Sequence, residues 1–294
     1  MKIKLKDIVE VFKITYNEWY KKDPFRQSAV IAYYSIFSIP GLLVLIITIA
    51  GYFLGKNVVN QHIMEQIAGT MGEDTANNIS GMLTAVSKSK STVAGTILGI
   101  GILIFGATGV FVELQKSLNQ VWQVKSAPQN GFFEFLKARF FSFGLILGIA
   151  FLLLISLVVS AALTAFENAI KFNTSGFMVI VFYILNFIFS FVVISGLFAL
   201  MFKILPDANI KWKYVWLGSI VTGLLFTIGK TALAYYFGKV QPATVYGAAG
   251  SIILILLWVS YSSMILFFGA EFTAAYAKMF TGKVPKRSKV LSST

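Results

Sequence analysis

Long apolar runs separated by short polar segments dominate this chain, and this pattern predicts helices that cross a membrane. The run between Tyr246 and Glu271 carries no charged residue. It is long enough to span a hydrocarbon core of ~30 Å at ~1.5 Å per helical residue. Six such runs predict six transmembrane helices, at about residues 27–54, 92–114, 140–163, 177–202, 214–237 and 246–270.

The last of these runs is more polar than a helix surrounded by lipid requires. We therefore expect it to face protein or water on one side and the other spans to be arranged around it. Its polar and amphipathic residues are Ser251, Trp258, Ser260, Tyr261, Ser262 and Ser263.

The first and second runs also carry local signals. Pro40 and Gly41 lie near the middle of span 27–54 and predict a bend, because proline removes a backbone hydrogen bond. The half before the bend holds Tyr33, Tyr34 and Ser38, and we expect it to face inward. Span 92–114 is rich in glycine, which favours close helix packing.

The polar segments complete the predicted architecture. In residues 4–22, apolar residues recur at three- and four-residue steps and charged residues take the opposite face of the helix. This amphipathic pattern indicates an interfacial helix on the cytoplasmic surface. A short helix packed under the bundle is the alternative. Residues 56–91 predict two short helices that form an external cap. The chain is thus divided into an interfacial helix (1–22), a six-helix bundle (23–277) and a basic cytoplasmic tail (278–294).

Composition supports an all-α integral membrane protein. Of the 294 residues, 57% are hydrophobic and 13% are charged, whereas soluble domains carry roughly 25% charged residues. In a soluble protein, the net charge of +13 would suggest nucleic acid. Here we expect membrane lipids with anionic headgroups as partners and no nucleic acid. Small-residue helix faces are also compatible with a homo-oligomer.

The distribution of basic residues predicts the orientation. With the N-terminus inside, nineteen of the 25 Lys and Arg residues fall in cytoplasmic segments and five in external ones; the last, Lys230, lies within a span. Positive residues collect on the cytoplasmic side of membrane proteins. We therefore expect a multi-pass protein of the cell membrane with both termini cytoplasmic.

Charged residues at span ends form one group of candidate site residues. By the predicted topology, four of them lie at the inner interface: Arg26, Glu113, Arg139 and Glu271. They could pair across the floor of the bundle and act as an inner gate. Alternatively, they are ion pairs at headgroup level that fix the order of the helices.

Lys230 lies roughly 10 Å of helix below the outer end of its span. It could extend its ammonium outward to the headgroups or face a cavity and hold an anionic group. Other polar residues of the spans could line the same path: Tyr33, Tyr34, Ser38, Asn186, Trp258 and Tyr261.

No familiar catalytic pattern is visible. The chain has no cysteine and one histidine, His62, in a polar segment. Neither the GxxxxGK[ST] phosphate-binding pattern nor a GxSxG nucleophile elbow occurs. We expect no catalytic residues, no metal site and no cofactor, and thus not an enzyme.

Four stretches resemble the YihY/BrkB family of bacterial inner-membrane proteins, once labelled ribonuclease BN. They are AVIAYYSIFSIPGLL (29–43), GATGVFVELQKSLNQVW (106–122), FKILPDANIKWKYVWLGS (202–219) and the stretch from YGAAG to GAEF (246–272). The resemblance implies six transmembrane helices. Some members are tied to serum resistance or envelope integrity, and the ribonuclease label is regarded as a misassignment.

Three functions follow as hypotheses. The first is a transporter or flippase-like permease for an amphiphilic, lipid-linked or anionic molecule. The second is an envelope-integrity scaffold that transports nothing. The third, a membrane-bound hydrolase or ribonuclease, has the least support, because the carboxylates of the spans form no cluster that would hold a metal ion.

Overall fold

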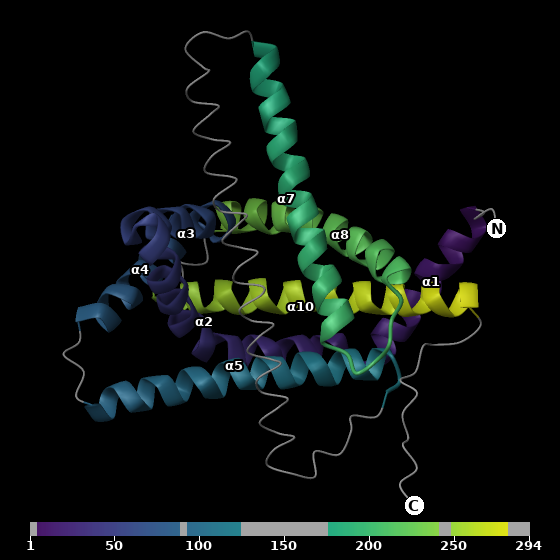
Figure 1. Ribbon diagram of the computed structural model, residues 1–294, viewed down its shortest axis with the longest axis horizontal. Coiled ribbons are helices and arrows are strands. Elements are labelled where there is room, and N and C mark those ends of the chain that lie inside the picture. The colour runs from purple at the N-terminus through teal and green to yellow at the C-terminus, as the bar shows by residue number, and fades with distance from the viewer. Residues whose placement is uncertain (1–4, 89–92, 125–175, 241–247, 282–294) are drawn as a thin grey trace, which may run out of the picture.

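The computed structural model describes residues 5–88, 93–124, 176–240 and 248–281, and all regular structure within them is helical (Figure 1). The predicted all-α class is confirmed for this part of the chain. The predicted span 140–163, Arg139 and most of the basic tail lie outside the described residues. The helices are α1 (Leu5–Lys21), α2 (Pro24–Leu54), α3 (Lys56–Met71), α4 (Glu73–Lys88), α5 (Val93–Val121), α7 (Gly176–Ile204), α8 (Trp212–Val240) and α10 (Ala248–Thr281).

Helix α10 lies at the centre of this arrangement. It contacts α1, α2, α3, α4, α5 and α8. In Figure 1 it runs between α8 and the pair formed by α2 and α5, while α7 rises away from the other helices. Ser251 and Ser263 of this helix are buried and Ser260 lies within hydrogen-bond distance of Ser28 on α2, so its polar residues meet protein, as the sequence predicts.

In the described part of the chain, fewer helices are long and apolar enough to cross a membrane than the six that the sequence predicts. Among the described residues, three stretches are long and apolar enough to cross a membrane: Ile184–Ile204, Trp212–Phe237 and Ala249–Met279. Helix α2 adds a fourth if its two parts, Pro24–Ile39 and Gly41–Thr48, count as one span. They meet at 46°, which confirms the bend predicted at Pro40. Six spans are not confirmed.

Small residues allow α8 and α10 to approach closely. A Cβ added to Gly218 would lie 1.7 Å from Thr273 Oγ1, and one added to Gly269 would lie 1.8 Å from Thr222 Oγ1. The pairing is therefore reciprocal, since each helix places a glycine against a threonine of the other. In the same way, Gly109 of α5 lies against the ring of Tyr34 on α2. The glycine-rich α5 thus packs closely, as expected.

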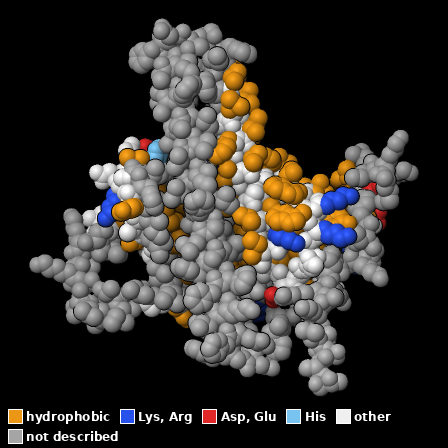
Figure 2. All heavy atoms as spheres, in the orientation of Figure 1, with side chains coloured by type: hydrophobic (Ala, Val, Ile, Leu, Met, Phe, Trp, Pro, Cys, Tyr) orange, Lys and Arg blue, Asp and Glu red, His pale blue; other side chains and the backbone are white. Residues whose placement is uncertain are grey.

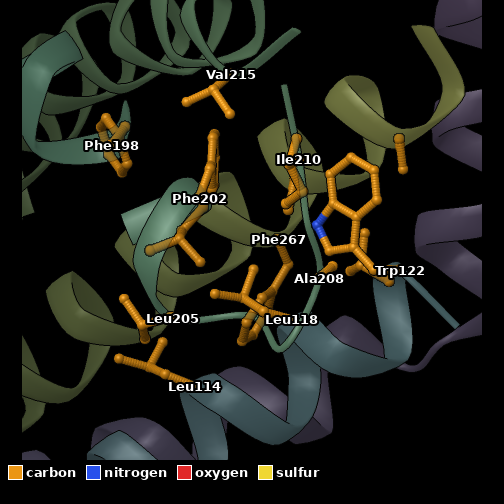
Figure 3. Close-up of a cluster of buried hydrophobic side chains, with 14 of the residues drawn as sticks. Leu114, Leu118, Trp122, Phe198, Phe202, Leu205, Ala208, Ile210, Val215 and Phe267 are labelled. Atoms are coloured by element: carbon orange, nitrogen blue, oxygen red, sulfur yellow. The ribbon is translucent and has the colours of Figure 1, made fainter. Parts of the chain in front are cut away.

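The largest hydrophobic core joins one end of α5, α7, α8 and α10 to the α7–α8 connection (Figure 3). Trp122 and Phe202 are fully buried in it. This end is the cytoplasmic one in the predicted topology. Side chains of the core include Leu114, Leu118, Trp122, Phe198, Phe202, Leu205, Ala208, Ile210, Val215 and Phe267.

The two short helices predicted for residues 56–91 are present as α3 and α4. Ile79 and Leu83 of α4 pack with Ile255 of α10 in a second core. Asn78 Nδ2 donates to Ser251 Oγ of α10 at 2.6 Å. The pair of helices is therefore fixed to the bundle by both apolar and polar contacts.

Helix α1 has two apolar faces with different surroundings. Val11 packs with Phe272 and Ala275 of α10. Tyr16 and Tyr20 are exposed on another face. The packed face agrees with the alternative of a helix under the bundle, and an interfacial role for the exposed face stays a prediction.

Candidate functional site

Polar side chains, four of them buried (Gln27, Ser28, Asn119 and Glu271), gather where α1, α2, α5, α10 and the α7–α8 connection meet. We call this group the polar base. Hydrogen bonds across it join segments that are far apart in the sequence. It consists of Lys22, Gln27, Ser28, Asn119, Gln120, Asp207, Ser260 and Glu271.

An ion pair joins the end of α1 to α10. Lys22 Nζ lies 2.5 Å from Glu271 Oε1, and the two side chains are 17% and 5% exposed. A buried carboxylate is costly without a partner, so Lys22 makes the charged form of Glu271 tenable. Nearby, Trp19 Nε1 donates to the carbonyl oxygen of Met264 at 3.2 Å. Both contacts hold α1 against the C-terminal half of α10.

Neutral hydrogen bonds join α2 to its neighbours. Gln27 Nε2 donates to Gln120 Oε1 of α5 at 2.9 Å and to the carbonyl oxygen of Lys22 at 2.8 Å. The hydroxyls of Ser28 and Ser260 lie 3.1 Å apart, which ties α2 to α10. The first turn of α2 is thus fixed on two sides.

A third set of bonds holds the α7–α8 connection against α5. Asn119 Nδ2 donates to Asp207 Oδ2 at 3.0 Å, and Asn119 Oδ1 accepts from the Asp207 backbone N–H at 2.8 Å. Gln115 Nε2 lies 3.4 Å from the same carboxylate oxygen. The Asn119 side-chain amide uses its donor on the Asp207 carboxylate and its acceptor on the Asp207 backbone N–H. Asn119 therefore holds both the backbone of the α7–α8 connection and the charged side chain of Asp207 in place.

The predicted inner-interface residues form ion pairs with other partners than expected. Arg26 Nε contacts Asp23 Oδ2 at 3.0 Å, and both side chains are exposed. Glu113 and Lys116 are 3.8 Å apart, across one turn of α5. Glu271 pairs with Lys22 rather than with Arg26. These three residues therefore do not pair with one another across the bundle.

The sequence contained a weak signal for the partners that were missed. Lys22 directly precedes the Asp23-Pro24 break. In the sequence it could not be distinguished from the solvent-facing lysines of the charged face of α1. Asn119 and Asp207 stand in two of the four stretches that carry the family resemblance. An amide in an otherwise apolar helix end and a Pro-Asp turn are the features that could have identified them.

Lys230 lies on a different part of the molecule. Seven residues, roughly two turns, separate it from Gly223, so both lie on one face of α8. Gly223 packs against Ser195 of α7. Two turns further along α7, Ile188 is exposed, and α7 rises away from α8 (Figure 1). Lys230 thus lies on the α7-facing side of α8, beyond the point where the two helices separate.

The surroundings of Lys230 differ from those of the polar base. Its side chain is partly buried. Within the described part of the chain, no hydrogen bond or ion pair joins it to another residue. Lys230 therefore carries a charge inside the candidate span Trp212–Phe237 without a described countercharge, which is the arrangement that marks functional positions in membranes.

The other substrate-path candidates do not come together around Lys230. Tyr261 fills the α8–α10 contact, where its hydroxyl donates to the carbonyl oxygen of Leu225 at 3.3 Å. Trp258 packs edge-on against Phe226 at 5.9 Å between ring centroids. Both therefore serve helix packing.

The candidates on α2 and α7 are also separate from one another. Tyr34 and Ser38 lie in the contact between α2 and α5, where Ser38 Oγ donates to the carbonyl oxygen of Ser35. Tyr33 is exposed. Asn186 Oδ1 is buried without a hydrogen-bond partner among the described residues. Nor does this part of the chain bring three His, Asp or Glu side chains together as a metal site would.

Comparison with known proteins places these features in a family. The sequence profile of the family described as virulence factor BrkB matches residues 15–292. The chain belongs to the BrkB family. The BrkB match includes the polar base and Lys230, so both lie in the part of the chain that defines membership.

Curated relatives of this BrkB chain carry the name "UPF0761 membrane protein". The protein of Saccharophagus degradans is 24% identical over 268 residues, which cover 90% of this chain and 58% of the relative. That of Pseudoalteromonas atlantica is 27% identical, covering 83% and 78%. That of Verminephrobacter eiseniae is 25% identical, covering 78% and 52%. The chain spans little more than half the length of several relatives it matches, and no solved structure matches it.

Proposed function

We propose that this BrkB-family membrane protein is a transporter or flippase-like permease for an amphiphilic, anionic or lipid-linked molecule. The observation that carries the proposal is Lys230: a cation within a candidate span, without a described partner, on the side of α8 where α7 separates from it. A charge at this depth is costly when no countercharge lies beside it, and none does among the described residues, which favours a role with an anionic ligand. No cofactor and no chemical step are part of this function.

The proposed topology has six spans, both termini in the cytoplasm and the cell membrane as location. Cysteine labelling tests it, because the chain has no cysteine of its own. Glu73→Cys on α4 should react with a membrane-impermeant maleimide in intact cells. Asn209→Cys in the α7–α8 connection should react only after permeabilisation. The opposite pattern would reverse the orientation.

In this topology the polar base closes the cytoplasmic end. Its ion pair and hydrogen bonds hold α1, α2, α5 and α10 together there, while Lys230 lies toward the external end. An anionic headgroup would enter beside α8 and exchange its hydration for the Lys230 ammonium. Passage inward then requires the contacts of the polar base to separate, which makes this group the proposed inner gate.

A lipid-translocation assay tests the proposal. The purified chain is reconstituted in phosphatidylcholine vesicles that contain fluorescent NBD-phosphatidylglycerol, and dithionite quenching reports movement between leaflets. The parent chain should accelerate movement over protein-free vesicles, and Lys230→Met should lose most of the gain. Lys239→Met, at the exposed end of α8, is the matched control and should retain it. Equal rates with and without protein would refute transport of this lipid class.

A non-transporting scaffold is the second candidate. It is favoured by the roles of Tyr261 and Trp258, which are occupied in helix packing rather than facing a path. A scaffold, as a homo-oligomer or with another envelope protein, should co-purify with its partner after cross-linking in cells. It should also tolerate Lys230→Met without loss of envelope integrity, whereas the transporter should not.

A further inference from the structure

Exposed large apolar residues form a stripe along α8. Its exposed residues recur mostly at four-residue steps, so neighbouring members touch while the stripe winds gradually around the helix. The stripe has aromatic pairs at both ends, and ~28 Å of helix separates Trp216 from Tyr235. This length matches a hydrocarbon core, and Trp and Tyr collect at its two boundaries. The stripe consists of Trp212, Trp216, Ile220, Leu224, Ile228, Tyr235 and Tyr236.

Three lysines surround the tryptophan end of this stripe. Lys211 and Lys213 flank Trp212 in the sequence and are exposed. Lys203 Nζ donates to the carbonyl oxygen of Ile210 at 2.5 Å and lies 5.8 Å from the centre of the Trp212 ring. Figure 2 shows Lys or Arg side chains beside hydrophobic ones where α8 begins.

The geometry holds this group together. The rings of Trp212 and Trp216 are 6.3 Å apart, and each residue is 47% exposed. The carboxylate in the same connection, Asp207, accepts hydrogen bonds from Asn119 and Gln115 of α5. The lysines thus present positive charge at the level where the tryptophans place the lipid headgroups.

We propose that this surface binds the phosphate of an anionic phospholipid. The Trp–Lys patch consists of Lys203, Trp212, Trp216, Lys211 and Lys213. Lys211 and Lys213 hold the headgroup, Lys203 positions Trp212 through its two contacts, and the acyl chains lie along the stripe below. A stripe that continues into the membrane selects a lipid over a soluble phosphate. The site is distinct from Lys230 and does not depend on transport.

Native mass spectrometry of the full chain in detergent, titrated with phosphatidylglycerol, tests this site. A basic residue near an anionic surface contributes about fivefold in affinity. Lys211→Ala/Lys213→Ala should therefore weaken phosphatidylglycerol binding roughly 25-fold. Lys13→Ala/Lys56→Ala, which removes two exposed lysines that do not contact the stripe, should leave it within twofold. Lys211→Arg/Lys213→Arg keeps both charges and should retain binding.

Three results would overturn the proposal. The first is equal affinity of the parent chain for phosphatidylglycerol and phosphatidylcholine. The second is unchanged phosphatidylglycerol binding by the double alanine variant, with its thermal unfolding midpoint unaltered. The third is displacement of the lipid by an equal concentration of inorganic phosphate, which would make the ligand a soluble anion. The arginine variant separates loss of charge from loss of fold.

Discussion

At the scale of single residues, the Lys22–Glu271 ion pair is the most consequential contact of the polar base. Glu271 is almost fully buried and Lys22 retains some contact with solvent. A surface pair lies one residue away: Lys21 donates to Glu18 at 3.0 Å, and this hydrogen bond lowers the pKa of the Glu18 carboxyl. Two lysines adjacent in sequence therefore have very different energetic roles.

Removing one partner of the buried pair should cost more than removing both. Lys22→Met leaves Glu271 buried and uncompensated, and we expect it to lower the free energy of unfolding by about 3 kcal/mol. Lys22→Met/Glu271→Gln should recover a large part of this loss. Thermal unfolding in detergent measures both variants.

The neighbouring lysine supplies the control for this prediction. Lys21→Met removes an exposed pair, and such pairs contribute about 0–1 kcal/mol. A double variant as unstable as Lys22→Met alone would show that Glu271 is stabilised by something other than Lys22.

At the scale of helices, α8 shows how one element serves several neighbours. Gly218 and Gly229 face α10, Gly223 faces α7, and the large apolar residues of the stripe are exposed. Each face follows from residue size and spacing. Small residues stand where another backbone approaches, and large ones stand where lipid does.

An added methyl group at the α8–α10 contact should therefore be destabilising. Gly218→Ala places a carbon 1.7 Å from Thr273 Oγ1, and overpacking of this kind costs about 1–3 kcal/mol. Gly196→Ala on α7 is the matched control, since nothing lies within 4 Å of its Cβ position. It should be neutral or slightly stabilising, because alanine favours the helix.

A second substitution checks the cause of that loss. Thr273→Ala removes the closest atom and should restore much of the stability lost in Gly218→Ala. Thermal unfolding of the two single variants and the double variant measures the coupling. Additive losses would mean that the two helices are further apart than in the structure.

At the scale of the whole molecule, the sequence predicts the helices better than their contacts. The predicted span 214–237 lies within α8 (Trp212–Val240), because the lysines on both sides of this long apolar run show in the sequence where the run begins and ends. The predicted span 246–270 became α10, which continues to Thr281. Its last turns are helical because Phe272 and Ala275 pack on α1, a contact that hydropathy alone does not reveal.

The candidate site was less predictable for the same reason. Glu271 and Lys230 stand out in the sequence because charge is rare in apolar runs. Their surroundings depend on residues far away in the chain: Lys22, the partner of Glu271, lies 249 positions earlier. Periodicity gives the face of a helix but not which neighbour covers it. Arg26, one of the candidate partners of Glu271, therefore could not be distinguished in advance from Lys22, the partner that the structure shows.

The proposed transport function requires Lys230 to lie on a water-accessible path, and the reactivity of a cysteine at this position tests that directly. Lys230→Cys and Ile228→Cys are compared in native membranes with a membrane-impermeant, positively charged methanethiosulfonate reagent. Ile228 lies two residues away on the lipid-facing stripe, and its side chain is 59% exposed. We predict that Lys230→Cys is modified and Ile228→Cys is not, because a thiol in lipid does not ionise. Equal or absent modification of both would contradict a path beside Lys230.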